Sequence, residues 1–456
     1  MNAALPWSRR VGYGVGDFAF NLFFTTATLY LLFYYTDVLG LPPQVAGWVF
    51  AVPMIWDAIA DPIMGYLASR TQSRWGRYRP YLLFGTVPLA LSWAVMFVPT
   101  GLTGTALVGF ALGTHLLFRT LYTVVSMPYL SLSAVMTTNS GERGILASVR
   151  MVAATSAGLL VALATPGLAH LLGRGDDAVG YALVMAGYAA LAALILFGVF
   201  AATREAVRDV EALPSLQSIL HMLRRNTPFW LIAGMLLFSS MASTLFGKTV
   251  PYLFKYELNR PGLIGPALGL LTLAALISIP LWTLLMRRWS KRAVALAGVA
   301  VSTVGWGAFL FLSGQSIPAI FACLVVLGVG GGAGALTFWA MIPDTVEFGE
   351  YRSGQRAEGM VFGIISFVQK AALGISVGVL GELLALIGYT PGRPQSAHTL
   401  ADMRLLMTLG PIACAFVAGA FLWFYPLDTS LHRRLVRVLE RRRAPFRQAT
   451  LAGDPR

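Results

Sequence analysis

Hydrophobic residues in this chain are gathered into about twelve long runs, and polar residues are gathered into the segments between them. A run of roughly 20 apolar residues is long enough to cross a bilayer as a helix. The pattern therefore predicts an all-α protein that crosses the membrane many times. The predicted spans are residues 17–39, 44–67, 81–99, 105–128, 145–171, 180–201, 228–252, 263–286, 293–313, 317–341, 360–387 and 404–425.

The loops between these spans alternate in charge. Residues 70–79, after the second span, and residues 287–292, after the eighth, each contain four basic side chains, and the C-terminal tail is also rich in arginine. Residues 40–44, 100–104 and 313–316, which follow spans one, three and nine, carry no charge. Lys and Arg accumulate in cytoplasmic loops. We therefore expect an inner-membrane protein with both termini and all even-numbered loops in the cytoplasm.

The spans fall into two groups of six, separated by a longer polar insert. Each group has a short basic loop between its second and third span, a weak internal repeat of the kind that transporters show. The insert after Ser215 and the tail over residues 431–443 have apolar residues at helical spacing, which predicts helices on the membrane surface. For the tail, a solvated run of charges is the alternative. The predicted domains are residues 1–202 (six-helix bundle), 203–227 (cytoplasmic linker), 228–427 (six-helix bundle) and 428–456 (basic cytoplasmic tail).

The composition narrows the possible functions. Hydrophobic residues make up 57% of the chain and charged residues 12%, about half the charged fraction of a soluble domain. The net charge of +14 is spread over short loops, so we expect no nucleic-acid partner. Cys323 and Cys414 lie in apolar runs and are expected as buried thiols, without a disulfide or metal. The sequence has no nucleotide-binding loop, His/Cys cluster or nucleophile motif. We therefore expect neither an enzyme nor a cofactor.

The second span contains two acids in an otherwise almost wholly apolar run. Asp57 and Asp61 are four residues apart and share one face of a helix. An acid at the bilayer centre costs roughly 2.5–3.5 kcal/mol, and adjacent like charges cost more. Pro62 has no N–H, which frees the carbonyl of Ala58 to face a cation. These oxygens predict a site for a hard cation or a proton. The alternative is that the acids pair with a basic residue of another helix and only fix packing.

Other polar residues at membrane depth are hypotheses for functional sites. Span four carries Arg119, Tyr122, Thr123 and Ser126, and the i, i+4, i+7 spacing of three of them predicts one polar face. We also assign Asp17, Arg150 and Lys370 to a site, with ion pairs that lock helices together as the alternative. Lys248 and Glu382 are equally compatible with either role, because both approach a water interface. Asp37 and His115 are interpreted as structural.

The chain resembles the glycoside–pentoside–hexuronide:cation symporters of the major facilitator superfamily, the group that includes the melibiose permease. The resemblance covers nearly the whole chain and is carried by several specific segments. These are Tyr34-Tyr35-Thr36-Asp37-Val38-Leu39-Gly40, Trp56-Asp57-Ala58, Asp61-Pro62-Ile63-Met64-Gly65, Ser73-Arg74-Trp75-Gly76-Arg77-Tyr78-Arg79-Pro80, Glu142-Arg143, Ser148 to Arg150, Phe348-Gly349-Glu350-Tyr351 and Ile387-Gly388-Tyr389.

The resemblance implies a twelve-helix major facilitator fold in two six-helix bundles, with a site that opens to each side of the membrane in turn. It implies a cation site at Asp57, Asp61 and Thr123, with the two acids as sodium ligands if sodium is the coupling ion. It implies a sugar site at Asp17, Tyr122 and Arg150, with Lys370 near both sites. Arg119 and Ser126 complete the set of residues that we assign to the substrate.

Four positions differ from the melibiose permease. Ser126 stands where that protein has a sugar-binding Asp, and Leu130 where it has a stacking Trp, which argues against a galactoside. Ala60 stands where it has an Asn, which favours a proton over sodium. Arg119 adds a positive charge to span four, which suits an anionic substrate such as a uronide.

The function that we predict from the sequence is cation-coupled symport of a sugar or glycoside by a monomer in the lipid bilayer, with Na⁺ or H⁺ as the coupling ion. A proton-coupled carrier of an organic anion or lysolipid is the alternative within the transporter class. A non-transporting receptor or scaffold is the alternative from another class, although a scaffold has little reason to bury a charged stripe.

Overall fold

The computed structural model describes residues 5–137, 140–205, 224–312, 316–354 and 358–427, together with residues 431, 434, 435 and 437–439. Within these ranges the chain is helical and has no strand. Twelve of the described helices have 18 or more residues. They are α2 (Gly16–Phe33), α3 (Pro43–Arg70), α4 (Arg79–Met96), α5 (Gly104–Met136), α6 (Ser140–Gly173), α7 (Asp177–Ala202), α9 (Thr227–Tyr252), α10 (Ile264–Arg288), α11 (Lys291–Leu312), α12 (Ile317–Ser353), α13 (Glu358–Leu386) and α14 (Ala397–Trp423).

Each predicted span coincides with one of these helices, so the predicted all-α, twelve-helix fold class is confirmed. By length and composition alone, ten segments of the described chain could cross a membrane, and α3 and α4 are not among them. The acids Asp57 and Asp61 lie in α3. The predicted surface helix after Ser215 lies outside the described residues, and the predicted tail helix lies mostly outside them.

Several boundaries were wrong, because the helices continue beyond their apolar parts. α12 extends to Ser353 rather than to residue 341, and it ends at Gly354, whose positive φ of 74° and hydrogen bond to the Glu350 carbonyl form a C-cap. α5 extends to Met136 rather than to residue 128. α14 begins at Ala397 rather than at residue 404. Hydropathy detects the segment that contacts lipid, whereas backbone hydrogen bonding sets the helix length.

The structure also adds short helices to the predicted spans. α1 (Trp7–Gly14) precedes α2 directly. Two five-residue π-helical turns, η1 (Tyr34–Val38) and η2 (Leu253–Glu257), extend α2 and α9. A short 3-10 helix, η3 (Pro261–Leu263), leads into α10.

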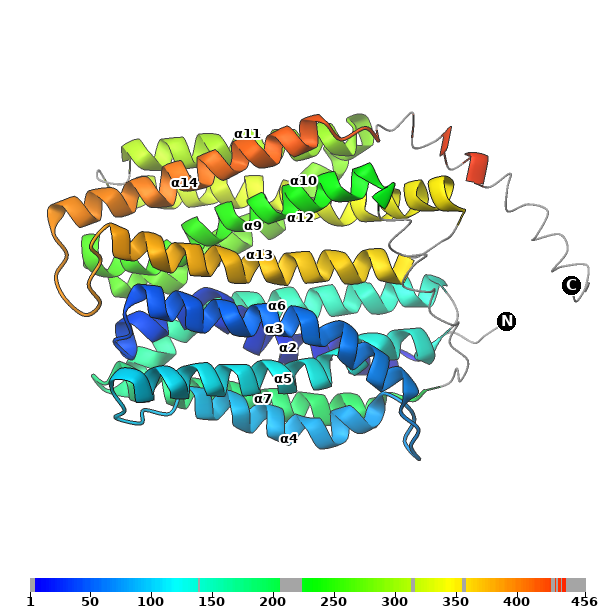
Figure 1. Cartoon of the computed structure of the whole chain (residues 1–456), viewed down its shortest axis with the longest axis horizontal. Coiled ribbons are helices and arrows are strands. Elements are labelled where there is room, and N and C mark those ends of the chain that lie inside the picture. Colours follow the sequence, from blue (N-terminus) through cyan, green and yellow to red (C-terminus); the bar gives the residue numbers. More distant parts are fainter. Residues whose placement is uncertain are drawn as a thin grey trace, which may run out of the picture. The chain divides into compact units, whose positions relative to one another are not determined.

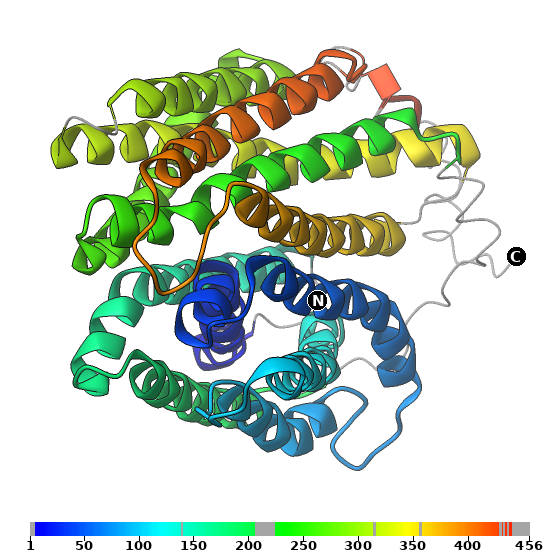
Figure 2. The ribbon, with the colours of Figure 1, turned by 60° about the vertical axis from the view of Figure 1, so that its left-hand side comes forward.

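The chain divides into two compact units. The first unit is Met1–Glu211, Ser243–Thr272 and Lys370–Thr408. Its helices α2 to α7 pack in neighbouring pairs, among them α3 with α5, α4 with α5 and α2 with α6. Figure 1 shows these helices running alongside one another, and Figure 2 shows them closer to end-on. One end of α9, α10, α13 and α14 also belongs to this unit, which brings residues from the second half of the sequence against the first half.

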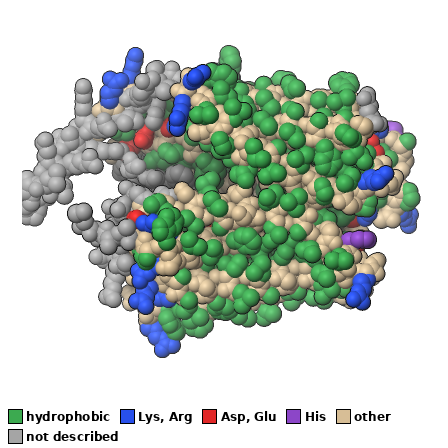
Figure 3. Space-filling model, turned by 180° about the vertical axis from the view of Figure 1, so that it is seen from behind, with side chains coloured by type: hydrophobic (Ala, Val, Ile, Leu, Met, Phe, Trp, Pro, Cys, Tyr) green, Lys and Arg blue, Asp and Glu red, His purple; other side chains and the backbone are tan. Residues whose placement is uncertain are grey.

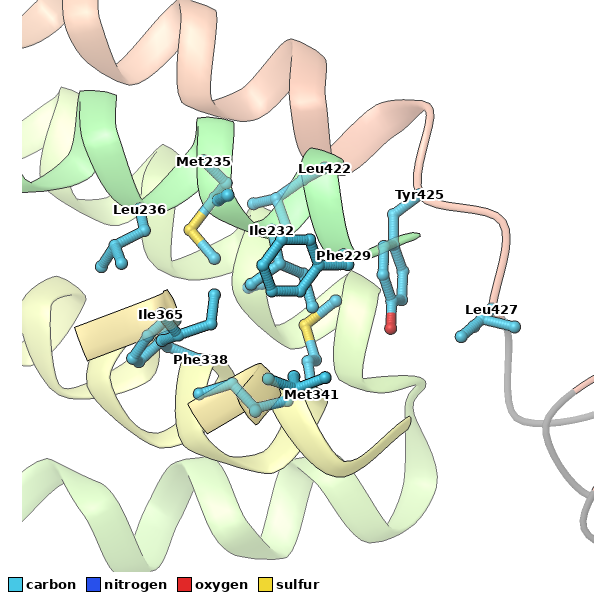
Figure 4. Close-up of a cluster of buried hydrophobic side chains, with 14 of the residues drawn as sticks. Phe229, Ile232, Met235, Leu236, Phe338, Met341, Ile365, Leu422, Tyr425 and Leu427 are labelled. Atoms are coloured by element: carbon cyan, nitrogen blue, oxygen red, sulfur yellow. The ribbon is translucent and has the colours of Figure 1, made fainter. Parts of the chain in front are cut away.

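The second unit is Ala212–Ala242, Leu273–Gln369 and Leu409–Arg456. Its core is a cluster of buried apolar side chains from α9, α12, α13 and α14, including Phe229, Met341 and Leu422 (Figure 4). α11 packs closely on α12, where a Cβ at Gly298 would lie 2.5 Å from the Cβ of Ala333. Burial of these apolar side chains stabilises the unit.

Large apolar side chains cover the sides of the helices. On α3 they include Trp48, Val52, Ile59 and Ile63, all of which are exposed. Figure 3 shows hydrophobic side chains over the lateral surface, with Lys and Arg gathered toward the ends of the helices. An exposed apolar surface of this kind is stable in hydrocarbon rather than in water.

Candidate functional site

The two acids of α3 meet α5 inside the first unit. Asp57 is completely buried and Asp61 is 9% exposed. The Thr123 hydroxyl lies 2.5 Å from Oδ1 of Asp57 and 2.9 Å from Oδ1 of Asp61. A hydroxyl has one proton, so it can donate to only one of the two carboxylates at a time. The i, i+4 spacing that predicted a shared face for the acids is thus observed, and Thr123 joins them.

Lys370 of α13 lies between the two acids. Its Nζ is 2.8 Å from Oδ2 of Asp57, and it donates a hydrogen bond to Oδ2 of Asp61. Its side chain is 14% exposed. The positive group that two adjacent buried carboxylates require is therefore a basic side chain in this structure.

A row of glycines brings α13 close to α3. Gly374, Gly378 and Gly381 face α3, and a Cβ at Gly381 would lie 2.5 Å from the carbonyl oxygen of Pro43. Small residues at three- and four-residue spacing allow two helix backbones in a membrane to approach closely. Lys370 lies one turn before this row on the same helix, so the close contact positions its ammonium at the acids. The glycine spacing is visible in the sequence, and it is the signal that could have predicted this helix contact.

Arg119 lies on the other side of Asp57. It is completely buried, and its Nη1 is 3.7 Å from Oδ2 of Asp57. Its Nε donates to Nε2 of His115 at 3.3 Å, and the other ring nitrogen of His115 lies 3.1 Å from the Val49 carbonyl. Within the described chain, neither Nη1 nor Nη2 of Arg119 has a hydrogen-bond partner. The predicted polar face of α5 therefore turns inward, toward α3.

Asp17 and Arg150 form a second charged group, between α2 and α6. Nε of Arg150 donates to Oδ2 of Asp17, and Nη2 lies 3.3 Å from Oδ1, which makes the pair bidentate. The guanidinium carbon lies 5.5 Å from the ring centroid of Tyr129, so a cation–π contact adds to the pair. The side chain of Arg150 remains 24% exposed. This pair is more accessible than the acids of α3.

Tyr122 and Ser126 continue the polar face of α5. The Tyr122 ring packs edge-on against the Phe20 ring, with 5.6 Å between the ring centroids, and Tyr122 is 8% exposed. The buried Ser126 hydroxyl has no hydrogen-bond partner in the part of the chain that the structure describes. The structure therefore places every predicted site residue inside one unit. It joins the predicted cation ligands to Lys370 and Arg119, and it pairs Asp17 with Arg150.

Asp37, for which the sequence predicted a structural role, has unusual surroundings. Its side chain is completely buried and accepts hydrogen bonds from Lys255, Tyr256 and Tyr389. The neighbouring Thr36 hydroxyl also donates to Asp37, at 2.8 Å. No local pattern indicated this cluster, because Lys255, Tyr256 and Tyr389 come from segments far along the chain.

Two further charged residues, for which the sequence allowed either a site or a structural role, have direct partners. Lys248 is 4% exposed and donates to the Thr28 carbonyl. Glu382 accepts from Trp48 at 2.9 Å on an exposed part of α13. Lys248 therefore belongs to the interior of the first unit, whereas Glu382 lies at its surface.

A fold of long apolar helices around a buried set of charged residues defines an integral membrane transporter. The profile of one family, described as MFS/sugar transport protein, matches residues 12–429, and the chain belongs to this family. It is not an enzyme.

The sequence similarity to known relatives extends over almost the whole chain. The chain is 32% identical to the glucuronide carrier protein homolog of Escherichia coli, over 97% of each protein. It is also 32% identical to the isoprimeverose transporter of Lactiplantibacillus pentosus, over 99% of this chain and 94% of that one. The solved D-xylose-proton symporter has the same fold, with a TM-score of 0.70 at 16% identity, over 93% of this chain and 98% of that one.

Proposed function

We propose that the protein is a secondary active transporter that couples the movement of a sugar or glycoside to that of a monovalent cation. The observation that carries the proposal is the cluster of Asp57, Asp61, Thr123 and Lys370, two buried acids joined by one hydroxyl and one ammonium group. Relatives named as a glucuronide carrier homolog, an isoprimeverose transporter and a putative glycoside/cation symporter support the kind of solute and the coupling.

The coupling cation binds at Asp57 and Asp61 and takes the place of the Lys370 ammonium. Two carboxylates and a hydroxyl supply oxygen ligands, which suit Na⁺, and the carboxylates can equally take up a proton. Lys370 is released when the cation arrives, so cation binding changes the contacts of α13 with α3. A cation that favours the same state as the solute strengthens its binding, and the solute strengthens cation binding by the same factor.

The solute binds at Asp17 and Arg150, beside Tyr122 and Ser126. A carboxylate accepts hydrogen bonds from sugar hydroxyls, and a guanidinium donates several to them. The partial exposure of Arg150 and the unpartnered Ser126 hydroxyl support this assignment. Tyr122 supplies an aromatic face and a hydroxyl to the same region. Lys370, which contacts both acids of the cation site, is assigned to the solute as well.

The transporter works by alternating access, as a monomer with both termini in the cytoplasm. Residues 1–202 and 228–427 are the two bundles, and residues 203–227 link them. The uncharged loops on one side and the basic loops on the other support this orientation. Switching access to the site from one face of the membrane to the other requires no covalent chemistry. It requires only a change in which ends of the helices contact each other.

Gradient-driven uptake tests the proposal. Purified protein in proteoliposomes should accumulate a labelled glycoside above the external concentration when a Na⁺ or H⁺ gradient is imposed, and should only equilibrate it without one. Imposing the two gradients separately identifies the ion. A set of neutral and acidic methyl glycosides with gluco, galacto and xylo rings covers the solute class. If none of them is accumulated under either gradient, the proposal is wrong.

A further inference from the structure

The turns η1 and η2 are one structural motif that occurs in both halves of the sequence. In each, the N–H of the residue after the turn bonds to a carbonyl five residues earlier, and the N–H two residues further on bonds to a carbonyl six residues earlier. Each turn is also followed, at the same distance, by a residue with positive φ, Gly40 at 72° and Asn259 at 51°. The residues of the two turns therefore correspond one to one.

The two turns meet at one carboxylate. Oδ1 of Asp37 accepts hydrogen bonds from Lys255 at 2.8 Å and from Tyr256, both in η2. Oδ2 accepts from the Thr36 hydroxyl at 2.8 Å and from Tyr389, which follows α13, at 2.6 Å. Lys255 is the third residue of η2 and Thr36 the third residue of η1, so the equivalent positions of both turns donate to Asp37. The carboxylate thus joins three segments that are far apart in the sequence.

The four donors use the whole hydrogen-bonding capacity of the Asp37 side chain. An unprotonated carboxylate has about four acceptor sites on its two oxygens. This side chain is completely buried, so bulk water does not replace a donor that is lost. A buried charge that lacks its donors is strongly unfavourable. An amide at this position would supply one acceptor oxygen and a nitrogen that is itself a donor, and that nitrogen would face two donors of the network.

Further hydrogen bonds extend the network and fix its direction. The Thr36 hydroxyl has one proton and donates it to Asp37, so the Tyr252 hydroxyl, 2.9 Å away, donates to Thr36. Tyr256 likewise donates to Asp37 and accepts from the N–H of Gly392 at 2.9 Å. The network therefore includes the end of α9 and the loop after α13 in addition to the two turns.

All of these segments belong to one face of the membrane. η1 follows the first span, η2 the seventh and Tyr389 the eleventh, and odd-numbered spans of one chain end at the same face. The uncharged loop after the first span predicts that this face is extracellular. α13 also stays against α3 as far as this face, because a Cβ at Gly381 would lie 2.5 Å from the carbonyl oxygen of Pro43, the first residue of α3. In this structure the face is therefore closed between α3 and α13.

We propose that the hydrogen bonds to Asp37 form a releasable latch that holds this face closed. The inference rests on the proposed function in one respect, namely that alternating access requires the face to open. Opening separates the first half of the chain, which supplies Asp37 and Thr36, from the second half, which supplies the other three donors. Thr36 stays with Asp37, because it is the neighbouring residue, and the three donors of the second half are exchanged for water. The strength of these three bonds therefore sets the ratio of closed to open molecules.

Distances between spin labels test the latch. Labels are placed on cysteines introduced at Thr103 in the first half and Arg393 in the second half, which are both exposed and both lie in loops after odd-numbered spans. The two native cysteines, Cys323 and Cys414, are replaced by Ala. Pulsed electron paramagnetic resonance should give mainly short distances in the parent protein, and long distances report an open face. The measurement needs no solute, so its result does not depend on which solute is transported.

Two variants weaken the latch to different degrees. Asp37→Asn removes the charge and places an amide donor against two donors, so it should raise the ratio of long to short distances on the order of tenfold or more. Tyr389→Phe removes one donor and keeps the carboxylate, so it should raise the same ratio by about threefold. The melting temperature of each variant is measured alongside the distances. If Asp37→Asn does not fold, the shift in Tyr389→Phe decides.

The control is Asp176→Asn, which removes an equal charge from an exposed helix N-cap after the fifth span while retaining a good capping residue. It should leave the distances unchanged. A parent protein without the short distances would refute the latch. So would variants that keep the parent's ratio of distances, and a fall in melting temperature alone would identify Asp37 as a structural residue. Either result leaves the proposed function intact, because that function is refuted by the absence of gradient-driven accumulation, which the distances do not measure.

Discussion

Asp57→Asn is expected to abolish gradient-driven accumulation of solute while exchange of solute down its own gradient continues. The substitution keeps the size of the side chain and removes one of the two charges that hold the cation. The remaining carboxylate of Asp61 cannot offset both Lys370 and a coupling ion, because charge pairs are strong in a buried site. Solute binding should persist at lower affinity, since the cation no longer strengthens it.

The structure also predicts a side effect of this variant. Asp57 is the one carboxylate within 4 Å of Arg119 among the described residues, and Arg119 is completely buried. Leaving such a base unpaired costs roughly 3–5 kcal/mol, so the single variant should melt at a lower temperature. The double variant Asp57→Asn with Arg119→Gln removes both charges together and should recover much of this stability.

The double variant separates the two interpretations of the acids. If Asp57 holds the coupling cation, the double variant is stable and still fails to accumulate solute. If Asp57 serves only as the counter-ion of Arg119 and fixes packing, restoring stability should restore accumulation. The measurements are the melting temperature, the solute affinity and the uptake with and without a cation gradient, on the parent and on both variants.

Asp17→Asn and Arg150→Gln are each expected to abolish solute binding while cation binding survives. Each substitution breaks the bidentate pair between α2 and α6 and removes a charged group that hydrogen-bonds sugar hydroxyls. The predicted loss of affinity is about 2–5 kcal/mol, which is about thirtyfold or more. The cation site lies on α3 and α5 and keeps all of its ligands. Calorimetric titration with solute and with cation checks both parts of the prediction.

The double variant that exchanges the two residues, Asp17→Arg with Arg150→Asp, serves as the control. It retains an ion pair between α2 and α6 and should restore the melting temperature without restoring solute binding. Loss of cation binding with intact solute affinity in either single variant would reverse the assignment of the two sites.

The sequence predicted the twelve long helices because each contains a long, mainly apolar run. It did not predict α1, whose segment contains Arg9 and Arg10 and is not apolar. In the structure, Arg10 forms a buried ion pair with Glu142 of α6 at 2.7 Å. That contact joins residues far apart along the chain. A pattern along the sequence cannot show it.

For the site, too, the sequence predicted what depends on spacing within one helix and missed what depends on contacts between distant segments. Helical spacing predicted that Asp57 and Asp61 share a face and that α5 has a polar stripe, and both features are observed. The position of Lys370 between the acids depends on α13 packing on α3, which spacing within one helix does not specify. For Asp37 the sequence predicted only a structural role. Its donors from other segments, among them Lys255, become its neighbours only through the fold.

The effect of the cation on solute affinity, and of the solute on cation affinity, tests the central claim most directly. Solute affinity is measured on purified protein with and without the coupling cation, in the parent and in Asp61→Asn, which retains Asp57 as the partner of Arg119. Coupling through the two acids predicts that the cation tightens solute binding in the parent, that the solute tightens cation binding by the same factor, and that both effects vanish in Asp61→Asn. A cation effect of full size in Asp61→Asn would contradict it.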